Sequence, residues 1–197
     1  MKRCVLLVAL LVVAGASAQA NPVGLSANQL WRLEHGEIVV LDVVPPGGGI
    51  WQQGQGGTAV TFVNAFPKTV WRVLVDYPRH RGLYPRVTSA EVLAADRGRT
   101  LVRYVVGVGP LSFGFHVDNY PDEAHGRLVW RLDRERRNSL FHDTWGYWQV
   151  EPRGDGVMLT YAMGARTTLP AFLTRRAERD GLVETVKAVR ERAEQSR

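Results

Sequence analysis

Apolar residues near the N-terminus follow first a helical period and then a strand-like one. Ser26 and Gln29 have the spacing of a capping box, and Leu30 and Leu33 give the following turns one apolar side. This pattern predicts a short helix. Residues 37–44 (EIVVLDVV) are rich in β-branched side chains and predict a strand.

The next segment predicts a strand followed by a helix. The Gly-rich residues 53–57 are expected to form a loop that leads into the apolar strand 58–64. Pro67 suits the first turn of a helix, where its missing N–H costs nothing. The helix then carries one apolar stripe, formed by Val70, Trp71, Leu74 and Val75.

Beyond Pro85 the chain reads as strands for about eighty residues, separated by short breaks of turn-forming residues. Such short connections imply that neighbouring strands are antiparallel. The predicted strands are residues 86–93, 100–108, 112–120, 127–132, 140–151 and 157–165.

The C-terminal segment changes to a helical period. From Pro170, apolar residues recur on one side and Arg and Glu fill most other positions, which predicts an amphipathic helix of about 24 residues. A long antiparallel sheet must bury one face, and this helix is the only element large enough to cover it. Because a strongly curved sheet wrapped on one helix leaves space between them, we expect an α+β protein with an internal cavity.

The first twenty residues have the pattern of an export signal. Met1 to Arg3 is basic, residues 5–13 are apolar, and Ala16 and Ala18 give a small-x-small cleavage site. The apolar run is shorter than the roughly 20 residues of a spanning helix, although a retained N-terminal anchor is the alternative. Localisation in the periplasm or outside the cell is therefore expected, and the mature chain would lack the single Cys4.

Charge and motifs exclude several classes of chemistry. Loss of Lys2 and Arg3 with the signal takes the formal net charge from +6 to +4, which is too small and dispersed to indicate nucleic-acid binding. The five histidines show no metal-ligand spacing, and no nucleophile elbow or phosphate-binding loop occurs. No metal or cofactor is therefore expected, and His116 or His142 would be the candidates if the protein used general acid–base catalysis.

Four segments resemble the START-like domains of the SRPBCC superfamily, whose members include coenzyme Q-binding proteins and polyketide cyclases. They are residues 70–77 (VWRVLVDY), 84–87 (YPRV), 146–152 (GYWQVEP) and 169–173 (LPAFL). The resemblance covers about residues 58–193. It implies the helix-grip fold, in which a curved antiparallel sheet of about seven strands grips the C-terminal helix, here with an added N-terminal helix and strand. It also implies a pocket for a sterol, phospholipid, quinone or polyketide, with no shared catalytic residue.

This reading divides the chain into a signal peptide (1–20), an N-terminal extension (21–57) and a START-like ligand-binding domain (58–197). Strand alternation and the final helix then suggest which side chains face the ligand, unless they simply fill a dry core. The candidates are Tyr104, Val106, Phe113, Phe115, Trp130, Trp148, Tyr161, Phe172 and Val186. Gly146 is expected to leave room beside Trp148.

Basic residues could contact a lipid head group or an anionic membrane, or they could form an ordinary solvated surface. Those on the final helix are Arg175, Arg176 and Arg179, and an earlier loop adds Arg79, His80 and Arg81. The hairpin at residues 107–111 has two glycines and an apolar tip, so it is a candidate gate or an ordinary tight turn.

Three functions remain open on the sequence. The first is an exported binding or carrier protein for a hydrophobic ligand such as a lipid or quinone. The second is a cyclase or aromatase acting on a polyketide-like substrate, which requires a polar titratable side chain in the pocket. The third is a protein-interaction module that uses the N-terminal extension.

Overall fold

The computed structural model describes residues 24–43, 55–168 and 171–196, and only the backbone of residues 108 and 171–178. The helices are α1 (Ala27–Glu34), α2 (Pro67–Val75), the 3-10 helix η1 (Tyr77–His80) and α3 (Ala171–Gln195). The strands are β1 (Val39–Leu41), β2 (Gln55–Val63), β3 (Val87–Asp96), β4 (Arg99–Val108), β5 (Leu111–Asp122), β6 (Arg127–Leu132), β7 (Phe141–Arg153) and β8 (Gly156–Thr167).

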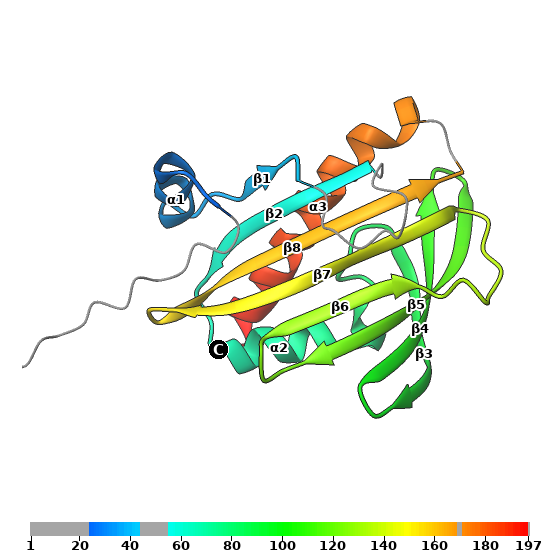
Figure 1. Ribbon diagram of the computed structural model, residues 1–197, viewed down its shortest axis with the longest axis horizontal. Helices are drawn as coiled ribbons and strands as arrows, with labels where there is room; N and C mark the ends of the chain where they lie inside the picture. Colours follow the sequence, from blue (N-terminus) through cyan, green and yellow to red (C-terminus); the bar gives the residue numbers. More distant parts are fainter. Residues whose placement is uncertain (1–23, 44–54, 169–170, 197) are drawn as a thin grey trace, which may run out of the picture.

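All eight strands form one curved, open antiparallel sheet in the order β1-β2-β8-β7-β6-β5-β4-β3. Helix α3 runs behind β2 and β8, and α2 lies near its C-terminal end (Figure 1). The α+β helix-grip architecture predicted from the sequence is therefore confirmed, with β1 as the added N-terminal strand. No helix in the described ranges is long and apolar enough to span a membrane.

Local sequence explains where the first two helices begin. Ser26 Oγ accepts a hydrogen bond from the Gln29 backbone N–H at 3.3 Å, and the Gln29 side chain accepts one from the Ser26 N–H at 2.8 Å. This is the predicted capping box at the start of α1. Helix α2 begins with Pro67 in its first turn and ends before Pro78, because proline cannot continue the backbone ladder.

The sequence predicted a loop at the Gly-rich residues 53–57, but the described part of this segment belongs to a strand. Gln55, Gly56 and Gly57 pair with β8 as the first residues of β2. A Cβ on Gly56 would collide with the Met163 carbonyl, and one on Gly57 would lie 2.9 Å from the Leu41 carbonyl oxygen. These glycines therefore let the strands and α3 approach closely instead of breaking the strand.

The inner face of the sheet carries two hydrophobic clusters. The first joins α3, through Leu182, Val186 and Val189, to α2 and to the strands β2, β7 and β8. The second lies under β4, β5 and β6 and is closed by Tyr77 of η1. Helix α3 therefore covers one half of the sheet, while η1 covers the other half.

The N-terminal extension packs on the opposite, outer face. Leu25, Leu33 and Val39 form a third buried cluster with Val60 and Met158. The neighbours of Val60 and Met158 in their strands point into the inner core, so these two side chains face outward. The described part of the extension is thus integrated into the fold.

Candidate functional site

A cavity of about 180 Å³ lies between α3 and the inner face of the sheet, where the two inner clusters meet. Among the residues whose side chains are described, its wall combines members of both clusters with Thr185 of α3. The lining residues are His80, Tyr84, Pro85, Val87, Tyr104, Phe115, Val117, Asn119, Leu128, Trp130, Trp148, Tyr161 and Thr185.

Strand pairing places the aromatic side chains of this wall side by side. Trp148 of β7 is directly opposite Tyr161 of β8, and their rings stack with centroids 4.2 Å apart. Tyr104 of β4 is opposite Phe115 of β5, with ring centroids 5.8 Å apart. Directly opposed residues of an antiparallel pair point to the same face. The register therefore builds flat apolar walls from residues far apart in the sequence.

Gly146 makes room for Trp130, not for Trp148 as the sequence suggested. Gly146 and Trp130 are opposed across β6 and β7. A Cβ on Gly146 would lie 2.5 Å from Cζ2 of the Trp130 indole and would also collide with the Ala162 carbonyl. The absent side chain is what allows the Trp130 ring to lie across its partner strand and form part of the cavity wall.

His80 is a buried polar residue of the wall, although its neighbours in sequence suggested a basic surface loop. Only 2% of its surface is exposed. Its Nε2 lies 3.1 Å from the Leu74 carbonyl and its Nδ1 lies 2.9 Å from the Tyr104 hydroxyl. Burial lowers the pKa of His80 from 6.5 to about 4, so the ring is neutral near pH 7.

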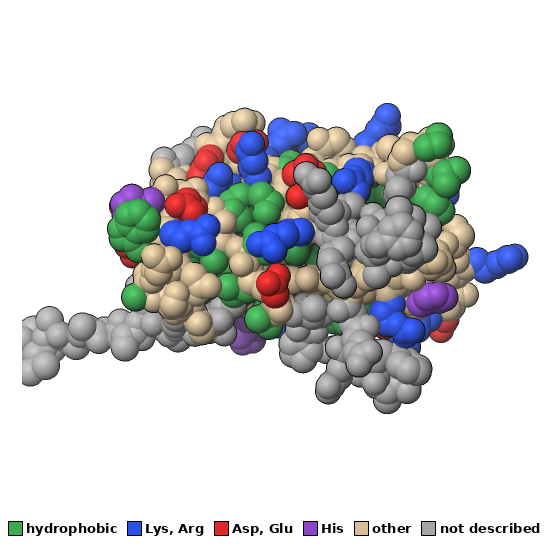
Figure 2. All heavy atoms as spheres, turned by 90° about the horizontal axis from the view of Figure 1, so that it is seen from above, with side chains coloured by type: hydrophobic (Ala, Val, Ile, Leu, Met, Phe, Trp, Pro, Cys, Tyr) green, Lys and Arg blue, Asp and Glu red, His purple; other side chains and the backbone are tan. Residues whose placement is uncertain are grey.

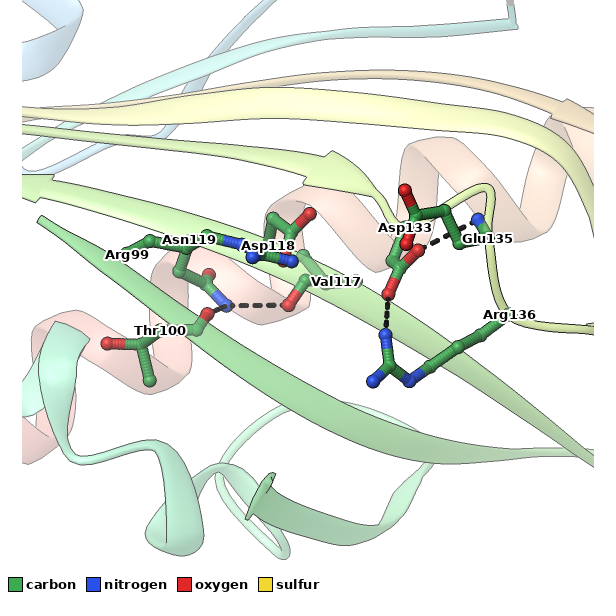
Figure 3. A network of polar contacts seen from close by, with 8 residues as sticks. All are labelled: Arg99, Thr100, Val117, Asp118, Asn119, Asp133, Glu135 and Arg136. Carbon is green, nitrogen blue, oxygen red and sulfur yellow. Dashed lines mark hydrogen bonds and ion pairs between the residues drawn. The ribbon is translucent and has the colours of Figure 1, made fainter. Parts of the chain in front are cut away.

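Three tyrosine hydroxyls and one amide add further polar groups. Burial raises the pKa of Tyr84, Tyr104 and Tyr161 well above the usual value of 10. The Tyr84 hydroxyl is buried and has no hydrogen-bond partner among the described residues, and the indole of Trp148 lies close to it. The Asn119 side chain donates from Nδ2 to the carbonyls of Thr100 and Val117 (Figure 3).

Five of the nine predicted ligand-facing residues line the cavity: Tyr104, Phe115, Trp130, Trp148 and Tyr161. Val106 and Phe113 are half-buried nearer the β4–β5 hairpin and lie outside the lining set. Val186 is fully buried in the first core cluster. The side chain of Phe172 lies outside the described residues.

Other lining residues had no signal in the sequence, or only a weak one. Strand parity with Phe115 places Asn119 on the inner face, and parity with Trp130 does the same for Leu128. Tyr84 and Pro85 come from an irregular segment with no period, and His80 comes from a single turn of 3-10 helix. These positions depend on tertiary packing alone.

The predicted basic groups and the hairpin lie elsewhere. Arg179 is exposed, and its guanidinium lies 3.8 Å from the Asp42 carboxylate. The side chains of Arg175 and Arg176 lie outside the described residues. No described residue of the 107–111 hairpin lines the cavity, which instead reaches the segment holding Pro85 and Val87.

The two histidines proposed as acid–base candidates do not line the cavity. Phe115 and Val117 face the cavity, so His116 between them faces the outer side of the sheet. His142 is exposed. Within the described ranges, no three His, Cys, Asp or Glu side chains are grouped so that they could hold a metal ion.

Comparison with known families agrees with this architecture. Residues 63–190 match the family model described as polyketide cyclase / dehydrase and lipid transport. The chain therefore belongs to this family, and its structural neighbours confirm the START-like resemblance. No curated protein matches the sequence significantly.

Several solved structures share the fold at low sequence identity. A STAR-related lipid transfer protein from Xanthomonas axonopodis is 19% identical, with a TM-score of 0.63 over 79% of this chain and 92% of that one. The Zhui aromatase/cyclase from a Streptomyces species is 19% identical, with a TM-score of 0.58 over 70% and 92%. A START superfamily protein from Mycobacterium smegmatis is 18% identical, with a TM-score of 0.60 over 71% and 97%. At these identities the similarity establishes the fold alone.

Replacing Gly146 tests the support of the Trp130 wall. We expect Gly146→Ala to lower the free energy of unfolding by roughly 1–3 kcal/mol, because its Cβ overlaps the indole and a backbone carbonyl. Gly114→Ala is the matched control, since its Cβ would be 3.5 Å from an Arg103 nitrogen, an ordinary contact. Urea unfolding measures both, and equal effects would contradict the proposed role of Gly146.

The buried His80 predicts a specific dependence of stability on pH. Between pH 6.5 and about 4 the unfolded chain binds a proton at His80 that the native protein does not. The free energy of unfolding should therefore fall as the pH is lowered through this range, by roughly 2–3 kcal/mol from this group. Urea unfolding at about pH 7 and about pH 4.5 should show this loss in the native protein and not in His80→Phe. An identical loss in both would show that other groups cause it.

Proposed function

We propose that this protein is an exported carrier that binds a flat hydrophobic molecule, or the ring system of a larger lipid or quinone, in the cavity. The observation that carries the proposal is the aromatic wall formed by Trp148, Tyr161 and Trp130 around a cavity of about 180 Å³. Flat aromatic rings offer large apolar contact area to a planar ligand. One structural neighbour is a STAR-related lipid transfer protein, which supports the same function.

The cavity volume limits the size of the ligand. An apolar cavity of about 150 Å³ in another protein binds benzene, whereas pockets for drug-sized molecules begin near 300 Å³. At about 180 Å³, this cavity has room for one or two fused rings. A larger lipid would have to leave the rest of its length outside this space.

Charge supports a neutral ligand. No Asp, Glu, Lys or Arg is among the lining residues in the part of the chain whose side chains are described, and the lining tyrosines and His80 are uncharged near pH 7. An ionised head group placed there would lose its hydration without gaining a counter-charge. The polar end of a charged lipid is therefore better placed outside the cavity.

A cyclase or aromatase is the second candidate, because the Tyr104–His80 pair places titratable groups in the cavity and one structural neighbour is the Zhui aromatase/cyclase. The details favour binding over catalysis. With a pKa of about 4, His80 is a weak base, and its Nδ1 is already engaged by Tyr104. Among the residues whose side chains are described, no cationic group lines the cavity to stabilise a developing oxyanion.

Neither a membrane contact nor an interaction module is needed for the carrier function. On the face shown in Figure 2, basic and acidic side chains of the described residues are interspersed. The described part of the N-terminal extension is occupied by packing on its own sheet.

Filling the cavity from α3 tests the location of binding. Thr185 lines the cavity and is buried, so Thr185→Phe should lower the affinity for 2-naphthol and for a naphthoquinone by about tenfold or more. Thr185→Val keeps the side-chain volume and should bind as the native protein does. Titration calorimetry measures the affinities, and native mass spectrometry shows any co-purified ligand. Unchanged binding to Thr185→Phe would place the site elsewhere.

Export has its own test. Expression of the full chain in a Gram-negative host should yield a periplasmic protein whose N-terminus, determined by sequencing, follows Ala18 or Ala20. A control that replaces apolar residues 6–8 with charged ones should remain uncleaved in the cytoplasm. Cytoplasmic accumulation of the uncut native chain would refute the export part of the proposal and leave ligand binding untouched.

A further inference from the structure

The polar groups of the cavity wall differ in whether they can still donate a hydrogen bond to a ligand, accept one, or do both. His80 Nε2 lies 3.1 Å from the Leu74 carbonyl oxygen, which can only accept a hydrogen bond. Nε2 must therefore carry the ring proton, and Nδ1 of the neutral ring is an acceptor. The Tyr104 hydroxyl, 2.9 Å from Nδ1, must donate its proton to it. The sole proton of Tyr104 is thus committed to His80, and only lone pairs remain for a ligand.

Asn119 also has no proton left to donate to a ligand. Both hydrogen bonds of its Nδ2 go to backbone carbonyls, at 3.2 Å to Thr100 and 3.3 Å to Val117 (Figure 3). An amide nitrogen has two protons, so both are used. Asn119 lines the cavity and is almost fully buried, and the Oδ1 atom is the part of its amide that remains without a partner among the described residues.

The remaining hydroxyls are less restricted. Tyr161 Oη lies 3.7 Å from the Met163 sulfur, an acceptor too weak to commit its proton, so this hydroxyl can still donate or accept. Tyr84 Oη has no partner among the described residues and can either donate or accept. The Thr185 hydroxyl and the indole N–H groups of Trp130 and Trp148 also belong to lining residues and can donate. Tyr104 Oη and Asn119 Oδ1 are therefore the two side-chain oxygen atoms of the described wall that can only accept.

From this arrangement we propose that the cavity selects planar apolar molecules that carry a hydroxyl group, which donates its proton to Tyr104 Oη. His80 is the positioning residue, because it fixes the direction of the Tyr104 proton. This inference rests on the proposed function, since it assumes that the ligand occupies this cavity. It adds that an alcohol or phenol is preferred over its ether, because an ether has no proton to donate and would place its oxygen against another acceptor.

The test compares two probes of the same ring system, 2-naphthol and 2-methoxynaphthalene, by titration calorimetry on the purified protein at neutral pH. The native protein should bind the naphthol about tenfold more tightly than the ether. Tyr104→Phe removes the acceptor and should reduce this ratio to about two or less. Tyr77→Phe is the matched control and should keep the native ratio, because Tyr77 is buried in the second cluster but is not among the lining residues.

His80→Phe separates positioning from a merely structural role. Without the Nδ1 acceptor, the Tyr104 proton is free to point into the cavity, so the ether should gain affinity while the naphthol does not. A general loosening of the structure would weaken both probes together and leave their ratio unchanged. Far-UV circular dichroism and the thermal unfolding midpoint show whether each variant is folded.

The outcomes distinguish this inference from the carrier proposal. Equal affinity of the native protein for both probes, or an unchanged ratio in Tyr104→Phe, overturns the hydroxyl selectivity and leaves cavity binding standing. Failure of both probes and of the naphthoquinone to bind overturns both. A native preference for the naphthol that is lost in Tyr104→Phe and kept in Tyr77→Phe supports both.

Discussion

A straight helix cannot lie flush against a strongly curved sheet, and this mismatch governs the interior of the protein. Helix α3 packs on β2 and β8 through Leu182, Val186 and Val189, and there the core is closed. As the sheet curves away toward β3, the helix no longer follows it, and η1 covers that part instead. The cavity lies at the boundary between the two packing regions. The cavity is thus a consequence of the curvature of the sheet, and large aromatic side chains fill it only partly.

Much of the fold could be read from the sequence because it depends on local periods. The six strands after Pro85 and the long C-terminal helix were predicted within a few residues of their observed ends. The errors arose at glycines, because glycine occurs both in loops and in strands that approach a neighbour closely. Gly56 and Gly57 look like a loop in the sequence, but in the sheet they permit close contact with β8 and with β1. The period of apolar residues along one strand carries no information on such distances between neighbouring strands.

The candidate site was predictable only on its strand side. Tyr104, Phe115, Trp130, Trp148 and Tyr161 follow from alternation, since period two fixes which face each side chain joins. The opposite wall comes from η1 and the irregular residues after it, where no period exists. His80 illustrates the limit: between Arg79 and Arg81 it reads as part of a basic loop, yet its ring is turned inward and bonded to Leu74 and Tyr104.

Gly146 has a consequence for how ligand range could change in this fold. Its missing side chain determines where the Trp130 indole rests, yet glycine itself has nothing to offer a bound molecule. The size of the cavity is therefore partly determined at Gly146, which is not among the lining residues. A single replacement there would move the Trp130 indole and reshape the space while leaving the hydrogen-bonding groups of Tyr104 and Asn119 in place, so the size and the polar chemistry of the accepted ligand can be adjusted independently.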